Sequence, residues 1–239
     1  SIGDFSGDGR PDLAISLGPP DAKFILVTLL NQGGGRFSAP EIYQPNPALG
    51  EDPALYPREI AIGDVSGDGI GDLVVLNRRS GGWIGVLQGQ RDSQPRRPST
   101  IVSSLLGENE NCNPGSITMA DFDRDGRNDA AFTCPYWVSL LLHDGTRLPR
   151  RPHVITPAPD NLKLNTLILA QDVDRDGAAD LLVADNAFRL FIGRNNGKGV
   201  FSFEETSPLP RDAGLTALRL QDANEIGRAS CRERVSSPV

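Results

Sequence analysis

The sequence has little of what most enzymes and membrane proteins require. No apolar run approaches 18 residues, so we expect no membrane-spanning helix in this chain. Histidine occurs twice, at His143 and His153, and neither stands in a metal-ligand or H-E-x-x-H arrangement. Phosphate-binding motifs are absent, and residues 63–67 have the wrong spacing for a serine-nucleophile elbow. Aspartate pairs that could imitate a glycosidase dyad belong to one kind of loop. We therefore predict that the chain is not an enzyme.

Positive charge is also scarce. The chain has 24 Lys and Arg against 31 Asp and Glu, which gives a formal net charge of −7 at pH 7. Proteins that bind nucleic acids concentrate positive charge, so this balance argues against a nucleic-acid partner. Helical periodicity is missing too, because no long stretch repeats its apolar residues every 3.6 positions. A helical solenoid is therefore excluded.

What the sequence has in quantity is repetition. Four segments align without gaps, at residues 4–13, 64–73, 121–130 and 172–181, and a fifth begins at Asp222 and then stops matching. Their first residues are 60, 57, 51 and 50 positions apart, and the four complete segments hold fourteen aspartates. Repetition at such a period indicates a fold built from similar supersecondary units.

Short apolar runs surround each segment and are bounded by Gly, Pro, Asn and Asp, which is typical of strands. The runs before the segments are 59–63, 116–120, 167–171 and 215–221, and those after them are 13–17, 73–77, 130–134 and 181–185. Third runs follow at 24–30, 83–87, 137–142 and 188–192, and more polar fourth runs at 37–43, 100–104, 153–156 and 201–205. Four short antiparallel strands per unit make one propeller blade, so we predict an all-β β-propeller fragment with four four-stranded blades.

The aspartate-rich loops predict a cation site in each blade. We name them loops one to four, at residues 4–12, 64–72, 121–129 and 172–180, and number their residues as positions 1 to 9. Oxygen-bearing side chains stand at positions 1, 3 and 5, Gly at position 6 for a sharp turn, and Asp at position 9. Position 7 varies freely, as expected if it offers its backbone carbonyl. The predicted ligands are Asp4, Ser6, Asp8, Arg10, Asp12, Asp64, Ser66, Asp68, Ile70, Asp72, Asp121, Asp123, Asp125, Arg127, Asp129, Asp172, Asp174, Asp176, Ala178 and Asp180.

Calcium is the predicted ion, with about four sites, one per blade loop. Hard oxygen donors without Cys or His favour Ca²⁺ over transition metals, and Mg²⁺ prefers fewer protein ligands. The alternative is that the loops are plain Asx turns, although carboxylates so close together would repel one another. An EF-hand is excluded, because a strand-like apolar residue replaces its Glu at position 12. Ser6 and Ser66 replace an Asp at position 3, so we expect weaker binding in loops one and two.

These loops resemble the FG-GAP/VCBS repeat family, the bacterial relatives of the integrin α-subunit β-propeller. Two Gly-rich segments, NQGGGRFSAPE at 31–41 and RNNGKGVFSF at 194–203, resemble the family's turn between third and fourth strands. The resemblance implies commonly seven blades, calcium in the loop between first and second strands, and an extracellular or cell-surface location. It also implies a ligand face on the opposite side, which would include residues 18–23, 44–57, 105–115 and 207–214.

The domain prediction follows from the repeat. Blades are expected at about 1–57, 58–115, 116–164 and 165–214, and another begins at 215–224, so that 1–224 forms one propeller piece of a longer protein. Residues 225–235 read EIGRASCRERV, which looks like a translated sequencing adapter. We expect 225–239 to be a non-native tail. Cys112 and Cys134 flank the first hairpin of the third blade, and either form a disulfide or remain two buried thiols.

Taken together, the sequence predicts a calcium-binding extracellular β-propeller that acts as a recognition or adhesion module for a protein or carbohydrate ligand. The alternative is a non-catalytic propeller appended to a secreted polysaccharide- or lipid-degrading enzyme.

Overall fold

The fold was analysed in a computed structural model. It describes residues 1–17, 25–43, 57–77, 83–102, 114–135, 137–143, 153–155, 167–185 and 189–206. These residues form strands, turns and bends, and there is no helix among them. None of this described portion could therefore cross a membrane as a long apolar helix.

Four antiparallel sheets of four strands make up the described fold, which confirms the predicted all-β class. Sheet 1 consists of β1 (Ile2–Gly3), β2 (Asp12–Leu17), β3 (Ile25–Leu29) and β6 (Glu41–Tyr43). Sheet 2 consists of β7 (Pro57–Gly63), β8 (Asp72–Asn77), β9 (Trp83–Gln90) and β10 (Ser93–Val102). Sheet 3 consists of β11 (Ile117–Ala120), β12 (Asp129–Thr133), β13 (Val138–Leu141) and β14 (His153–Ile155). Sheet 4 consists of β15 (Leu167–Gln171), β16 (Asp180–Ala184), β17 (Leu190–Asn195) and β18 (Phe201–Glu205).

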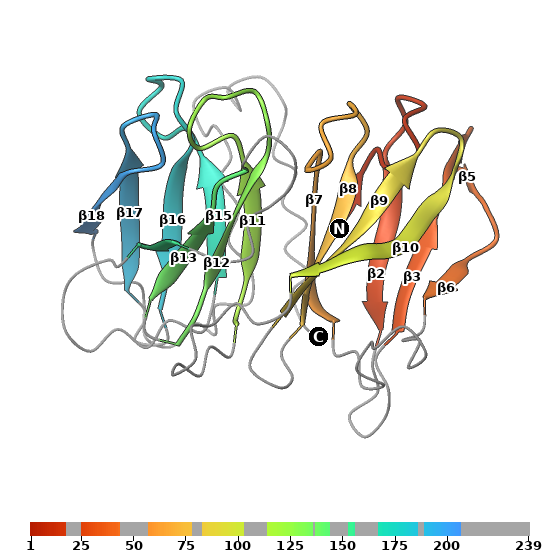
Figure 1. Ribbon diagram of the computed structural model, residues 1–239, viewed down its shortest axis with the longest axis horizontal. Coiled ribbons are helices and arrows are strands. Elements are labelled where there is room, and N and C mark those ends of the chain that lie inside the picture. The colour runs from red at the N-terminus through yellow and green to blue at the C-terminus, as the bar shows by residue number, and fades with distance from the viewer. Residues whose placement is uncertain are drawn as a thin grey trace, which may run out of the picture.

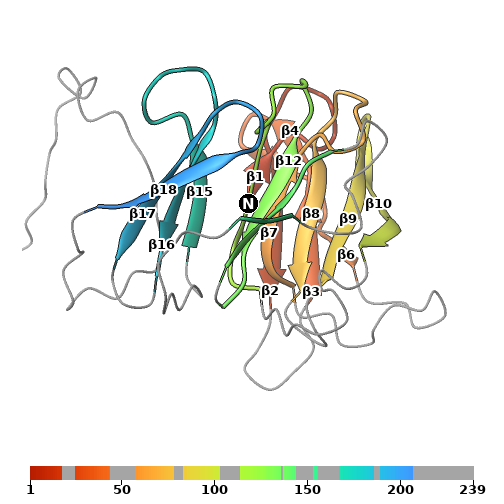
Figure 2. The same ribbon diagram turned by 60° about the vertical axis from the view of Figure 1, so that its left-hand side comes forward.

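Each aspartate-rich loop joins the first strand of its sheet to the second, and all four loops are closed in the same register. In every sheet the residue before position 1 pairs with the aspartate at position 9. These pairs are Gly3↔Asp12, Gly63↔Asp72, Ala120↔Asp129 and Gln171↔Asp180. The loops consequently lie together along one edge of the molecule, at the top of Figures 1 and 2.

The hydrophobic cores lie between neighbouring sheets. One cluster joins sheets 1 and 2 around Phe5 and Leu73, a second joins sheets 2 and 3 around Leu76 and Phe132, and a third joins sheets 3 and 4 around Phe191. Apolar residues on both faces of the second strands explain this arrangement, since a strand covered on both faces reads as a continuous apolar run. The sheets therefore pack face to face, as the blades of a propeller do.

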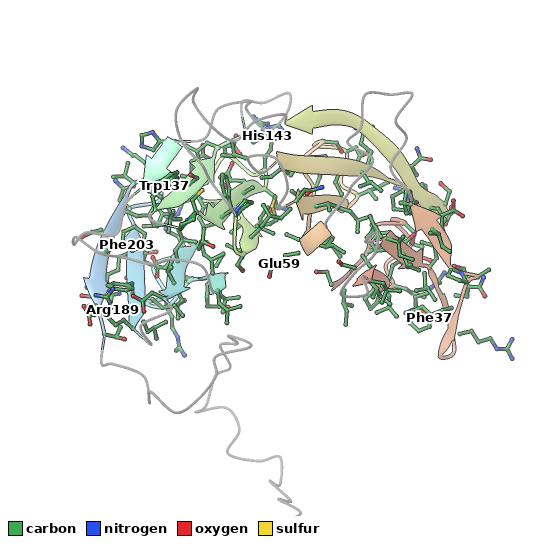
Figure 3. The ribbon with its side chains drawn as sticks, turned by 90° about the horizontal axis from the view of Figure 1, so that it is seen from below. Phe37, Glu59, Trp137, His143, Arg189 and Phe203 are labelled. Atoms are coloured by element: carbon green, nitrogen blue, oxygen red, sulfur yellow. The ribbon has the colours of Figure 1, made fainter. Side chains whose placement is uncertain are left out.

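The sheets follow one another along an arc, with Glu59 on its inner side (Figure 3). The first strands face a hollow of about 410 Å³, lined among others by Glu59, Thr118 and Leu169. Polar side chains on the first strand of one sheet accept hydrogen bonds from the backbone of the first strand of the next sheet. Glu59 Oε2 accepts from the N–H of Ile117 at 2.8 Å, and Thr118 Oγ1 accepts from the N–H of Ala170 at 3.1 Å.

The outward side of sheet 1 is more exposed than its counterparts in the other sheets. Ile15 and Leu17 on β2 are 38% and 47% exposed, as is Ile42 on β6 at 47%. Val75, which corresponds to Ile15, is 2% exposed because sheet 1 covers it. None of the other three described sheets packs against this side of sheet 1.

Two features differ from the predicted strands. The fourth strand of sheet 2 begins at Ser93, whereas the sequence predicted a start at residue 100. The prediction was late because Pro95 and Pro98 are residues typical of loops. The strand is at the edge of its sheet and its register shifts twice, and edges and bulges are where proline is tolerated. The Gly-rich segment at 31–41 forms a small hairpin of its own, β4 (Asn31–Gly33) with β5 (Arg36–Phe37). The predicted fifth blade and the tail at 225–239 lie outside the described residues.

Candidate metal-binding loops

Glycine at position 6 has the positive φ that the sequence predicts. The φ angles of Gly9, Gly69, Gly126 and Gly177 are 82°, 82°, 87° and 88°. Position 4 is also left-handed in every loop, a feature that the sequence did not predict. It is glycine in loops one and two, but Arg124 and Arg175 adopt φ of 62° and 64° in loops three and four. A side chain in this region costs about 1–2 kcal/mol, so the loops enforce their shape against local strain.

The aspartate at position 1 holds the turn closed. Asp4 Oδ1 accepts from the N–H of Gly7 at 2.7 Å, and Asp4 Oδ2 accepts from the N–H of Gly9 at 2.8 Å. Asp121 does the same in loop three, where its oxygens accept from the N–H groups of Asp125 and Gly126 at 3.0 and 2.9 Å. These are the bonds of the Asx-turn alternative, but they do not exhaust a carboxylate, which offers about four acceptor sites.

The aspartate at position 9 ties each loop to the end of the third strand of its sheet or to the residues just after that strand. Asp12 is fully buried, and its Oδ2 accepts from the N–H groups of Phe5 and Ser6 at 3.2 and 3.0 Å. Its Oδ1 accepts from the N–H of Asn31 at 2.8 Å. The corresponding donors to Asp72, Asp129 and Asp180 are the N–H groups of Gly89, His143 and Asn195, at 2.9, 2.7 and 2.8 Å. Ligation by both oxygens of this aspartate stays a prediction.

Two loops bring three carboxylates together in a way that would suit a cation. Oxygens of Asp121, Asp123 and Asp129 lie within 4.8 Å of one another, and so do those of Asp172, Asp174 and Asp176. All six residues are among the predicted ligands. Asp125 and Asp180 stand outside these groups, although they belong to the same loops.

Loop one has a buried polar group that a bound cation would satisfy. Ser6, at position 3, is 1% exposed, and its hydroxyl has no hydrogen-bond partner among the described residues. An unsatisfied buried hydroxyl costs about 1–3 kcal/mol, so its presence beside Asp4 and Asp8 calls for an explanation. A cation bound in loop one would supply the partner. In loop two the Ser66 hydroxyl donates to Asp64 Oδ1 at 3.4 Å.

Residues 4–75 match the FG-GAP-like repeat. This segment contains loops one and two and confirms the resemblance there. No curated protein matches the chain.

Two solved structures are similar to the chain in fold. One is a lectin from Agrocybe aegerita, described for its specific recognition of non-reducing terminal N-acetylglucosamine, with a TM-score of 0.53 and 17% identity. That likeness covers 85% of this chain and 50% of the lectin. The other is BBS1N, solved in complex with ARL6DN and soaked with lead, with a TM-score of 0.50 and 14% identity, covering 86% of this chain and 56% of the other. This chain therefore spans about half the length of each, and the likeness establishes a propeller-like fold.

Loops one, two and three are each completed by the sheet that follows them. The carbonyl of Asp4, at position 1, accepts from the N–H of Gly71 in loop two at 3.1 Å, and that of Asp64 accepts from Asn128 in loop three at 3.4 Å. The carbonyl of position 2 is bonded by the end of the next third strand. Phe122, for example, accepts from Asn195 Nδ2 at 2.7 Å and from the N–H of Gly199 at 3.0 Å. The side chain at position 2 is buried in three of the loops, at Phe5, Val65 and Phe122.

Arginine side chains pair with several loop carboxylates. At position 7, Arg10 binds Asp8, and Arg127 Nε lies 3.2 Å from Asp125 Oδ2. The side chains at position 7 thus differ in their surroundings: Arg10 and Arg127 pair with an aspartate at position 5, whereas Ile70 and Ala178 are buried apolar residues. The predicted carbonyl ligation by position 7 stays a prediction.

Burial changes the protonation of two position 9 aspartates. Burial raises the pKa of Asp129 to about 6, against the lowering effect of hydrogen bonds from the backbone of His143 and Phe122. Burial also raises the pKa of Asp72, while hydrogen bonds from Gly89, Val65 and Ser66 act in the opposite direction. A nearby cation would favour the charged forms of both groups. The carboxylates that converge in loops three and four, with no sulfur or imidazole group among them, would thus suit Ca²⁺.

The remaining sequence predictions concern residues around the loops. Cys134 is buried and disulfide-bonded, whereas Cys112 and Cys231 lie outside the described residues. Trp137 packs against the core between sheets 2 and 3. Most of the predicted ligand face lies outside the described residues as well.

Proposed function

We propose that this chain is a calcium-binding β-propeller module that acts outside the cell, recognises a protein or carbohydrate, and has no catalytic activity of its own. The observation that carries the proposal is a set of four loops closed in one register. Three carboxylates converge in loop three and three in loop four, and in loop one the buried Ser6 hydroxyl has no described partner. Oxygen donors at alternating positions are how Ca²⁺ collects its ligands.

The extracellular location is supported by two observations. Cys134 is disulfide-bonded, and disulfides persist in oxidising compartments. Calcium is also plentiful outside cells, where weak oxygen-ligand sites are filled. A carbohydrate ligand is supported by the fold shared with the Agrocybe aegerita lectin.

Calcium binding is tested by calorimetric titration of the full chain, together with melting curves in calcium and in EDTA. A site filled at a hundred times its dissociation constant adds about 2.7 kcal/mol to stability, so the melting temperature should rise clearly in calcium. The variant Asp123→Ala with Asp174→Ala should bind about two ions fewer than the wild type. Magnesium at the same concentration serves as the comparison cation. If the titration releases or absorbs no heat and the melting curves in calcium and in EDTA coincide, the proposed calcium sites are rejected.

Ligand recognition is tested on a glycan array probed with the full chain in calcium and in EDTA. Calcium-dependent binding to a defined set of terminal sugars would support a carbohydrate ligand. If the chain binds no glycan in calcium or in EDTA, a carbohydrate ligand is rejected and a protein ligand is the remaining alternative.

A further inference from the structure

Loop four differs from the other loops because two arginines from outside it hold its carboxylates. Arg194 on β17 places Nη1 3.0 Å from Asp174 Oδ2, and its Nη2 lies 3.0 Å from Glu204 Oε1 on β18. The guanidinium thus bridges the position 3 carboxylate to the outer strand of the same sheet. Asp174 belongs to the group of three carboxylates that would suit a cation.

The second arginine comes from the neighbouring loop. Arg124, at position 4 of loop three, donates through Nη2 to the backbone carbonyl of Asp176 at 2.8 Å and to Asp176 Oδ1 at 3.3 Å. Two glycines leave room for this guanidinium. A Cβ added to Gly197 would lie 3.0 Å from Arg124 Cζ, and one added to Gly177 would lie 3.5 Å from Arg124 Nη2. The arginine therefore has a defined place between loops three and four.

Among the described residues, no other loop has such a pair of arginines from outside it. The ion pairs between described residues join position 7 to position 5 in loops one and three, and none is formed in loop two. Loop four has alanine at position 7, so its carboxylates meet cationic groups from β17 and from loop three instead.

We propose that Arg124 and Arg194 are built-in counter-ions of loop four that compete with a divalent cation for Asp176 and Asp174 and so lower the calcium affinity of this loop. The inference rests on the proposed function. Without calcium, the two guanidinium groups offset the mutual repulsion of the carboxylates. With calcium, they repel the ion and occupy oxygens that it would use, so removing either should tighten binding about three- to tenfold at low ionic strength.

The test uses the full chain with Arg194→Gln, Arg124→Gln and the double variant. The control is Lys198→Gln, which removes a positive charge from the turn between β17 and β18, where Lys198 forms no ion pair with a described residue. Calcium affinity is measured by calorimetry, and melting is measured in EDTA and in calcium. The arginine variants should melt earlier than wild type in EDTA but show a larger rise in melting temperature on adding calcium, and one class of sites should tighten. The Lys198→Gln variant should show neither change.

A double-mutant cycle assigns the effect to loop four. In an Asp174→Ala background, Arg194→Gln should no longer alter calcium affinity, because the carboxylate that it releases is gone. If the wild type binds calcium and both arginine variants bind it with the same or lower affinity, this inference alone is overturned. Absence of calcium binding by the wild type would overturn the proposed function and this inference together.

Discussion

His143 Nε2 lies 2.8 Å from the carbonyl oxygen of Val65, so the segment just after the third strand of sheet 3 is bonded to the loop of sheet 2. A carbonyl only accepts, so Nε2 carries the hydrogen. The backbone N–H of the same histidine donates to Asp129 in its own loop. Asn195 makes the same two kinds of bond one sheet later, to Phe122 and Asp180. The two residues thus occupy equivalent positions in their sheets and make equivalent hydrogen bonds, one through an imidazole and the other through an amide side chain.

This equivalence predicts that asparagine can replace the histidine. Changing His143→Asn should alter the free energy of unfolding little, whereas His143→Ala should lower it by about 1–3 kcal/mol, since the buried carbonyl of Val65 would lose its partner. Urea denaturation in EDTA measures both variants. Equal losses in the two variants would show that packing of the imidazole, rather than its hydrogen bond, is what matters.

Ser6 predicts effects of opposite sign with and without calcium. In EDTA, Ser6→Ala should leave stability unchanged or raise it by about 1 kcal/mol, because it removes a buried hydroxyl that has no described partner. In calcium, the same change should weaken binding at loop one. Ser66→Ala is the matched control, since the Ser66 hydroxyl already donates to Asp64 and its loss should be mildly destabilising in EDTA. A loss of stability by Ser6→Ala in EDTA would contradict the interpretation.

Two glycines of sheet 2 should respond very differently to alanine. A Cβ on Gly89 would overlap the carbonyl oxygen of Gly71 and lie 2.7 Å from Ile70 Cγ2, so Gly89→Ala should destabilise the chain by about 3 kcal/mol or more. Gly69 has φ of 82° and nothing within 4 Å of an added Cβ, so Gly69→Ala should cost about 1–2 kcal/mol. Thermal unfolding ranks the two variants, and the reverse order would refute the close approach of β9 to loop two.

The raised pKa of Asp129 predicts a pH dependence in EDTA. Its pKa of about 6 in the folded chain exceeds the ordinary value of 3.8, so the folded state binds the proton more tightly. The stability that this provides is present below pH 3.8 and is lost as the pH rises through 6. The advantage of wild type over Asp129→Ala should therefore be about 2 kcal/mol larger near pH 4.5 than near pH 7.5. Urea denaturation at both pH values measures it, and a constant difference would contradict the burial effect.

The strands and loops were predictable because each depends on local pattern. Apolar runs such as 181–185 mark strands buried on both faces, and the spacing of Asp and Gly marks the loops. The left-handed conformation of Arg124 was not predictable, since arginine carries no signal for positive φ. Glycine at the same position in the first two loops was the available clue. The partners of Arg194 and His143 could not be predicted either, because they belong to segments whose relative placement only the packed sheets determine.

Hydrogen bonds from the next sheet along the chain close loops one to three, so each of these loops depends on the sheet that follows it. The loop carbonyls of Asp4 and Phe5 are satisfied by Gly71 and Gln90, which come later in the chain. Each of sheets 1 to 3 therefore depends on the next sheet along the chain to satisfy the carbonyls of its own loop. Shortening the chain from its C-terminal side would thus damage the last remaining loop first, and damage would spread toward the N-terminus one sheet at a time.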